Sequence, residues 1–369
     1  LIHLIVVFLC FIQVSVHGYN TNYQLTSALF ARHQFDTRPY IEIYQNIQTW
    51  RANHQLRQLA NIPSDAVNKR HQLFWTNFFW DNFLLEALLI TPIHEIRHAE
   101  VGVAYGADSI GFYGIFPLIY GEFSNTQSAH ICGSGVNLHT NLARKAYMGY
   151  LTGSEEWLFL NSSYISNKAG SMVYGGLLPF GDPYGYVHYM NKAGINIKRR
   201  DLVPYYILST MFSGGFIHSI RSSQAYLCCD ESSIKPLSFS GNGMEVFWPE
   251  FSVFLNPTNV SVLSETMVQS LEGEKHGGLI GIEHGVMGKS VPTEVTLGVN
   301  YRRHPVSFLS MVTFNNQTDY FFQNMLNYKW SPTYHLIASY KTGNLKTQRQ
   351  IREWFFSRDI LELGVKFQF

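Results

Sequence analysis

The last third of the chain alternates apolar and polar residues, and this pattern constrains the fold more than any other feature. From Gly243 onward, apolar side chains recur at every second position, with turn residues between the runs. Successive side chains of a strand point to opposite faces, so this period predicts antiparallel strands. The predicted strands are residues 246–248, 252–255, 260–263, 278–282, 294–301, 306–314, 320–328, 334–340 and 361–369.

The preceding part of the chain lacks this alternation. We therefore predict an α+β fold, in which a mainly helical region at 19–240 is followed by an antiparallel β-rich, barrel-like region at 241–369. Residues 1–12 form an apolar run, and Val16 and Gly18 fit the small-residue positions before a cleavage site. These features predict a signal peptide at 1–18, with an N-terminal anchor helix as the alternative.

Composition narrows the class of partner. The net charge is +1, so no overall field favours nucleic acid. Charged residues make up only 14% of the chain and aromatic residues 15%. Such a balance indicates a membrane interface or a β-rich envelope protein. The mean hydropathy of -0.06 is too low for a bundle of many membrane-spanning helices, whereas a transmembrane β-barrel hides its apolar residues by alternation.

The chemistry of the chain centres on residues 91–100, which contain His-Glu-x-x-His. On a helix, His94 and His98 lie one turn apart on the same face and can bind one metal ion. Thr91 is expected as the N-cap and Pro92 as the first helical residue, while Gly102 and Gly106 are places where the helix can end. Arg97 must point away from the metal, towards Glu100 or Asp81.

This pentapeptide resembles the signature of the zincin metallopeptidases. The resemblance implies that His94 and His98 bind Zn²⁺ and that Glu95 is the catalytic base that activates a zinc-bound water. A catalytic zinc site needs a third protein ligand. The metzincin continuation is absent, because Val101 and Ala104 stand where Gly and His would be required.

Two residues are favoured as the third ligand, His130 and Asp182, because both lie in turn-rich, weakly charged surroundings. The Pro-rich segment around Asp182 also resembles, in part, the Asp loop of the site-2 proteases. The other candidates remain open and are Glu155, Glu156, His139, His188 and His218. Residues 133–135 (Gly-Ser-Gly) are expected to form a turn before a helix at 136–150, and residues 110–118 a hairpin beside the metal helix.

The chain ends in alternating apolar residues that close on Phe369, which resembles the terminal strand of bacterial outer-membrane β-barrel proteins. Together these features predict a zinc-dependent peptide-bond hydrolase of the bacterial cell envelope, in the outer membrane or periplasm. Its partners would be a peptide or protein substrate and a membrane, not nucleic acid. One alternative is a non-enzymatic outer-membrane β-barrel protein with a helical plug. The other is an intramembrane metalloprotease, which needs residues 74–90 and 201–220 to be spans.

Overall fold

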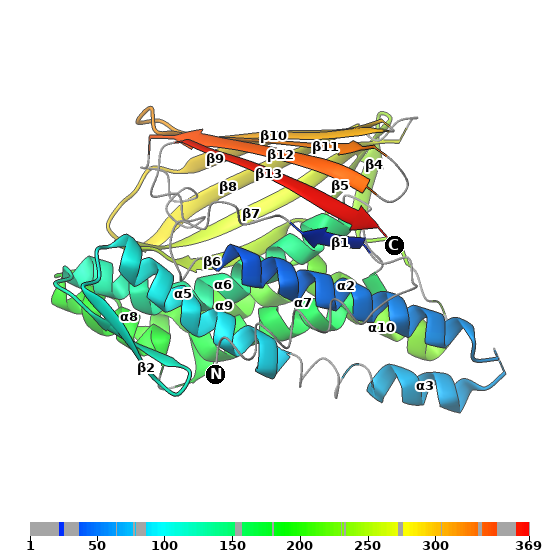
Figure 1. Ribbon diagram of the computed structural model, residues 1–369, viewed down its shortest axis with the longest axis horizontal. Coiled ribbons are helices and arrows are strands. Elements are labelled where there is room, and N and C mark those ends of the chain that lie inside the picture. Colours follow the sequence, from blue (N-terminus) through cyan, green and yellow to red (C-terminus); the bar gives the residue numbers. More distant parts are fainter. Residues whose placement is uncertain are drawn as a thin grey trace.

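The computed structural model describes residues 22–25, 37–63, 65–76, 78, 86–151, 157–178, 181–229, 231, 234–271, 276–303, 305–330, 334–344 and 359–368. The predicted signal peptide therefore lies outside the described residues, as do Glu155 and Glu156. Figure 1 shows two layers, with the helices packed beneath a curved antiparallel sheet. The predicted α+β class is confirmed, and the helices precede nearly all of the strands along the chain.

The helical layer is built around α6, a long helix that contacts α5, α7 and α8. The α-helices of the described chain are α2 (Arg38–Ala60), α3 (Val67–Trp75), α5 (Thr91–Ala104), α6 (Asn125–Leu151), α7 (Trp157–Met172), α8 (Asp182–Lys192), α9 (Arg199–Met211) and α10 (Gly214–Cys229). Two π-helical turns, η2 (Glu86–Ile90) and η3 (Val173–Leu177), lead into α5 and follow α7.

Helix α5, which contains the His-Glu-x-x-His motif, begins one residue earlier than predicted and ends just before Gly106, one of the two predicted ends. It continues directly from η2, so Ile90 rather than Thr91 is its N-cap residue. It ends at Ala104, and Gly106 follows with a φ of +85°, a conformation that favours glycine. Gly102 lies inside the helix, where a Cβ would fall 2.6 Å from Cγ2 of Ile119. The helix therefore packs closely on the hairpin β2 (Ser109–Tyr113) and β3 (Phe116–Tyr120), as the hairpin prediction required.

The sheet contains the strands predicted from the alternation, together with β4 (Ser238–Gly241), which was not predicted. The predicted strands are β5 (Met244–Phe247), β6 (Glu250–Leu255), β7 (Asn259–Ser270), β8 (His276–Gly288), β9 (Glu294–Arg303), β10 (Val306–Asn315), β11 (Tyr320–Lys329), β12 (Tyr334–Gly343) and β13 (Asp359–Gln368). β1 (Asn22–Leu25) pairs with β13, and β6 pairs with β7 beside the main path. Among the described strands no pairing joins β1 to β4 at the opposite end, so the predicted barrel-like closure is not seen there.

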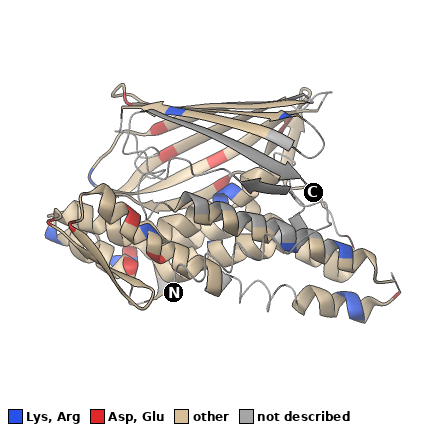
Figure 2. Cartoon of the chain, viewed as in Figure 1, with Lys and Arg blue, Asp and Glu red and all other residues tan. Residues whose placement is uncertain are grey.

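The two faces of this sheet have an inverted distribution of polarity. On one face Glu283 of β8 lies opposite Glu294 of β9, and both are buried. Beside them Thr296 and Thr313 are buried and share a hydrogen bond of 2.7 Å. Figure 2 shows acidic residues along these strands. The opposite face exposes apolar and aromatic side chains, namely Ile280, Ile282, Leu297, Val299, Phe308, Phe314, Leu326, Tyr328, Leu336 and Tyr340.

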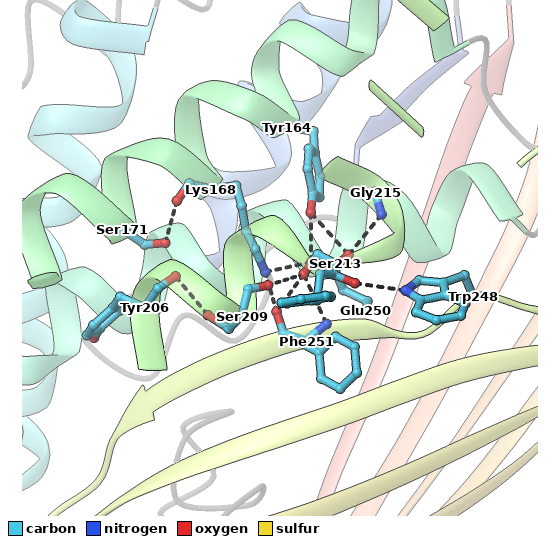
Figure 3. Close-up of polar contacts among 11 residues, drawn as sticks. Tyr164, Lys168, Ser171, Tyr206, Ser209, Ser213, Gly215, Trp248, Glu250 and Phe251 are labelled. Atoms are coloured by element: carbon cyan, nitrogen blue, oxygen red, sulfur yellow. Dashed lines mark hydrogen bonds and ion pairs between the residues drawn. The ribbon is translucent and has the colours of Figure 1, made fainter. Parts of the chain in front are cut away.

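Buried polar contacts join the helices to the sheet (Figure 3). Lys168 of α7 donates to Oε1 of Glu250 at 2.7 Å and also to the carbonyl of Phe251 in β6. Tyr164 donates to the same carboxylate at 2.9 Å, and both charged side chains are buried. On α6, Asn137 makes two hydrogen bonds to the backbone of Leu255, of 2.8 and 2.9 Å. These contacts connect α6 and α7 to β6.

The turn predicted at residues 133–135 is wrong, because α6 runs through them without a break. Residues 201–220, which the intramembrane alternative requires as one span, are divided between α9, which ends at Met211, and α10, which starts at Gly214. No helix among the described residues is long and apolar enough to cross a membrane.

Candidate metal centre

Three side chains from two helices meet at one point. His94 and His98 come from successive turns of α5, and Asp182 is the first residue of α8. The Nε2 atoms of His94 and His98 lie 2.9 and 3.0 Å from the same oxygen, Oδ2 of Asp182. An ion with tetrahedral bonds of about 2.0–2.1 Å would hold its ligand atoms about 3.3 Å apart. The three atoms are therefore already close to coordination spacing, and they form a possible metal-binding group.

Hydrogen bonds at the far nitrogens define which ring atom of each histidine has the proton. Nδ1 of His98 lies 2.6 Å from the carbonyl oxygen of Ile131, which can only accept. The Nδ1 atom of His98 must therefore be the donor, which leaves the lone pair of a neutral ring on Nε2. Ser134 also donates to the Ile131 carbonyl, at 2.7 Å, and its oxygen lies 3.2 Å from the same histidine nitrogen.

His94 is oriented by a longer chain of partners. Nδ1 of His94 lies 3.1 Å from Nε2 of His139, and Nδ1 of His139 lies 3.0 Å from Oδ1 of Asn167. Asn167 uses its amide nitrogen to donate to the carbonyl of Ser163 at 3.0 Å, so its oxygen faces His139. Burial and the neighbouring His94 lower the pKa of His139 to about 3, so its ring is neutral. His94 then donates from Nδ1 and, like His98, directs a lone pair at Asp182.

Two imidazole lone pairs and a carboxylate oxygen thus converge, an arrangement that requires a cation between them. Without a metal, a proton takes that role. Burial would lower the pKa of His98, but the Asp182 carboxylate outweighs burial and raises the pKa to about 9. Burial likewise opposes ionisation of Asp182, yet the two histidines hold its pKa far below the usual value. The donor set of two nitrogens and one oxygen fits a divalent metal equally well.

Gly135 of α6 gives this group its space. A Cβ at this position would lie 2.5 Å from Cε1 of His94 and 2.7 Å from Oδ2 of Asp182. Gly133 belongs to the Gly-Ser-Gly segment of the same helix, and a Cβ added there would lie 2.7 Å from Cβ of Leu255. The Gly-Ser-Gly segment therefore allows α6 to approach both the metal ligands and β6, while its serine contacts His98.

Glu95 is half-buried beside the three ligand residues. Burial raises its pKa, while the charges of His98 and His94 oppose that shift. No hydrogen bond joins Glu95 to another described residue, so its carboxylate is available to a water molecule. Arg97 points away, as expected, and donates to Oε2 of Glu100 at 2.7 Å.

Tyr174 lies at the edge of the group. Its ring contacts that of His94 edge-on, with centroids 5.7 Å apart, and its hydroxyl interacts with Asp182. Burial and the Asp182 charge raise its pKa to about 12, so the hydroxyl keeps its proton. Gly181, at a φ of +87°, makes room for this hydroxyl, because a Cβ there would fall 2.5 Å from it.

The other predicted ligands are placed elsewhere. Nδ1 of His130 hydrogen-bonds the hydroxyl of Tyr105 at 2.7 Å, and His130 is not a member of the metal-binding group. His188 contacts the ring of Tyr189, and His218 stacks on Tyr150. His139 was a candidate ligand and is instead a hydrogen-bond partner of His94. Asn167 was missed, and no sequence signal marks it.

No family of known proteins matches the chain, and neither a curated protein nor a solved structure resembles it at a significant level.

Proposed function

We propose that this protein is a zinc-dependent peptide-bond hydrolase of the bacterial cell envelope. One observation supports it above all others: the lone pairs of His94 and His98 converge on Asp182 beside a carboxylate, Glu95, that makes no hydrogen bond to another residue in the described part of the chain. Two histidines and one carboxylate, with a fourth position open, are a ligand set typical of catalytic zinc. Zinc in such a site lowers the pKa of water towards neutrality and polarises a carbonyl group.

The residues of the chain would supply the remaining chemistry. Glu95 would accept a proton from the attacking water and deliver it to the leaving amine, a role that its raised pKa suits. Tyr174 keeps its proton and can donate a hydrogen bond to the oxygen on which negative charge develops. The buried ion pair between Arg97 and Glu100 keeps the guanidinium away from the site.

A peptidase assay tests this proposal. The zinc-loaded protein is incubated with a library of fluorescence-quenched peptides, and turnover is compared for wild type, Glu95→Gln and Glu122→Gln. Glu122 is an exposed glutamate outside the site and is the matched control. We expect Glu95→Gln to lower turnover by about 10²–10⁴-fold and the control to leave it unchanged. Equal turnover by wild type and Glu95→Gln would overturn the role of Glu95.

A second proposal concerns where the protein works. The sheet exposes aliphatic and aromatic side chains on one face and buries glutamates on the other, which is the reverse of a sheet in water. β9 to β13 are each 10 residues long, which matches the length of a membrane-spanning strand. We propose that this outer face lies against lipid. The barrel-like form predicted for residues 241–369 stays part of this proposal.

Vesicle flotation tests the lipid contact. Protein in detergent is reconstituted with phosphatidylethanolamine–phosphatidylglycerol vesicles and floated on a density gradient. The variant Leu297→Glu/Val299→Glu places charges on the outer face. Ile220→Glu is the control, because Ile220 is an equally exposed apolar residue on α10. We expect wild type and the control to float and the double variant to stay in the dense fraction. Wild type that remains in the dense fraction contradicts the proposal.

A further inference from the structure

The chain of hydrogen bonds behind His94 is longer than the ligand set requires. It runs from His94 on α5 to His139 on α6, then to Asn167 on α7. Asn167 is anchored in turn to the carbonyl of Ser163 and to the hydroxyl of Tyr44 on α2, at 3.0 and 2.9 Å. Side chains of α6, α7 and α2 thus hold Nδ1 of His94, which is on α5.

We infer that His139 and Asn167 are positioning residues that fix the ring of His94 with its lone pair directed at the metal. This inference rests on the proposed function, since it assumes that a metal binds there. It assigns to two further residues of this chain a role that neither the pentapeptide nor the ligand group contains.

The direction of each hydrogen bond supports the inference. The carbonyl of Ser163 can only accept, so the amide nitrogen of Asn167 faces it and the amide oxygen faces His139. That oxygen can only accept, so the proton of His139 is on Nδ1. An imidazole that binds a metal through Nε2 has its proton on Nδ1, so Nδ1 of His94 donates and Nε2 of His139, 3.1 Å away, accepts.

The alternative arrangement of His94 is costly. If its proton moved to Nε2, two ring lone pairs would face each other at 3.1 Å inside the helical layer. His94 and His98 are therefore held in place by different kinds of partner. His98 is fixed by a backbone carbonyl of α6, which no substitution removes, whereas His94 depends on two side chains. Partners of this kind change metal affinity by about 10–100-fold when they are removed.

Zinc affinity, measured by competition with a chromophoric chelator, tests the inference. The variants are His139→Leu, Asn167→Leu and His139→Gln. The matched control is Asn161→Leu, because Asn161 is another buried asparagine of α7 and its amide nitrogen donates to the hydroxyl of Ser223 at 3.3 Å, not to a residue of the metal-binding group. Gln can place an amide oxygen near the position of Nε2, so it restores the acceptor for His94.

We expect His139→Leu and Asn167→Leu to weaken zinc binding by about 10–100-fold and His139→Gln to regain most of it. Asn161→Leu should lower the melting temperature and leave the affinity within about two-fold. The visible spectrum of the Co²⁺ form should change in the two Leu variants and not in the control. A stability effect alone would leave this spectrum unchanged.

Two outcomes overturn the inference, and they are distinguishable. If wild type binds zinc and both Leu variants bind it equally well, His139 and Asn167 have no positioning role, while the proposed function stands. If wild type binds no zinc, the proposed function fails and the inference fails with it.

Discussion

At the scale of single residues, Gly135 determines whether α6 can lie against His94 and Asp182. A methyl group there would come within 2.7 Å of Oδ2 of Asp182 and closer still to His94. We predict that Gly135→Ala weakens zinc binding by about 100-fold or more, because the ligands must move apart. Gly149→Ala is the control, since a Cβ at Gly149 of the same helix meets nothing within 4 Å. Isothermal titration with zinc measures both, and equal affinities would refute the assigned role of Gly135.

His98 gives the metal-free and zinc-loaded proteins opposite responses to pH. Without metal, its pKa in the folded protein is raised to about 9 by Asp182, despite burial. The stability that this adds is complete below a pH of about 6.5 and is lost as the pH rises towards 9. Zinc needs the neutral ring, so stability due to zinc is lost as the pH falls below about 6.5.

Melting temperatures between pH 6 and 9 check this prediction, in chelator and in excess zinc. The metal-free protein should become less stable with rising pH over this range. The zinc-loaded protein should gain stability between pH 6 and about 7 and keep it up to pH 9. Asp182→Asn should remove most of the first trend, because it removes the carboxylate that raises the pKa of His98. Parallel trends in chelator and in zinc would show that no proton is exchanged for metal here.

Sequence alone could locate part of the site. His94, Glu95 and His98 follow from the spacing of one helix, because residues four apart share a face. Asp182 was one of several candidates, since a ligand that is 84 residues from His98 leaves no local pattern. His130 was favoured for the same turn-rich surroundings, yet its ring faces Tyr105. His139 and Asn167 act through partners on other helices, which spacing within one segment cannot reveal.

At the scale of elements, the clearest error has a physical reason. A turn was expected at residues 133–135, because glycine favours turns. In α6 they remain helical and give close approach to β6 and to the metal ligands. The alternation of the last third predicted its strands well, because that pattern is local. The pairing of β1 with β13 was not predicted, since Asn22 and Gln368 stand at opposite ends of the sequence.

The junction between α7 and β6 depends on the buried pair of Lys168 and Glu250. We predict that Lys168→Met alone lowers the free energy of unfolding by about 3–5 kcal/mol, because Glu250 would keep a buried, uncompensated charge. The double variant Lys168→Met/Glu250→Leu should lose much less than the sum of the single variants. As a control, Asp201→Asn at the exposed contact with Arg200 should change stability by about 0.5 kcal/mol or less.

Chemical denaturation of wild type, the two single variants, the double variant and the control supplies these free energies. Additive losses for Lys168→Met and Glu250→Leu would mean that the two side chains do not interact energetically. That result would contradict the contact of 2.7 Å as a connection between the helical layer and the sheet.

At the scale of the whole molecule, the sheet and the helices form one arrangement around the metal-binding group. α6 lies against the metal-binding group at Gly135 and Ser134 and, two residues further on, bonds to β6 through Asn137. α8, which begins at Asp182, is fastened to the sheet by the hydroxyl of Tyr186, 2.9 Å from two backbone oxygens. The class and order of these layers followed from sequence periodicity, whereas their contacts follow from side chains far apart in the chain.

The most direct test of the account is the zinc content of the purified protein after dialysis against zinc and then buffer. We expect stoichiometric zinc in wild type and in Glu95→Gln, and its loss in His94→Ala and Asp182→Ala. His188→Ala is the matched control, because His188 is an exposed histidine of α8 outside the group, and it should keep its zinc. Wild type without zinc, or Asp182→Ala with full zinc, would contradict the central claim that His94, His98 and Asp182 bind one metal ion.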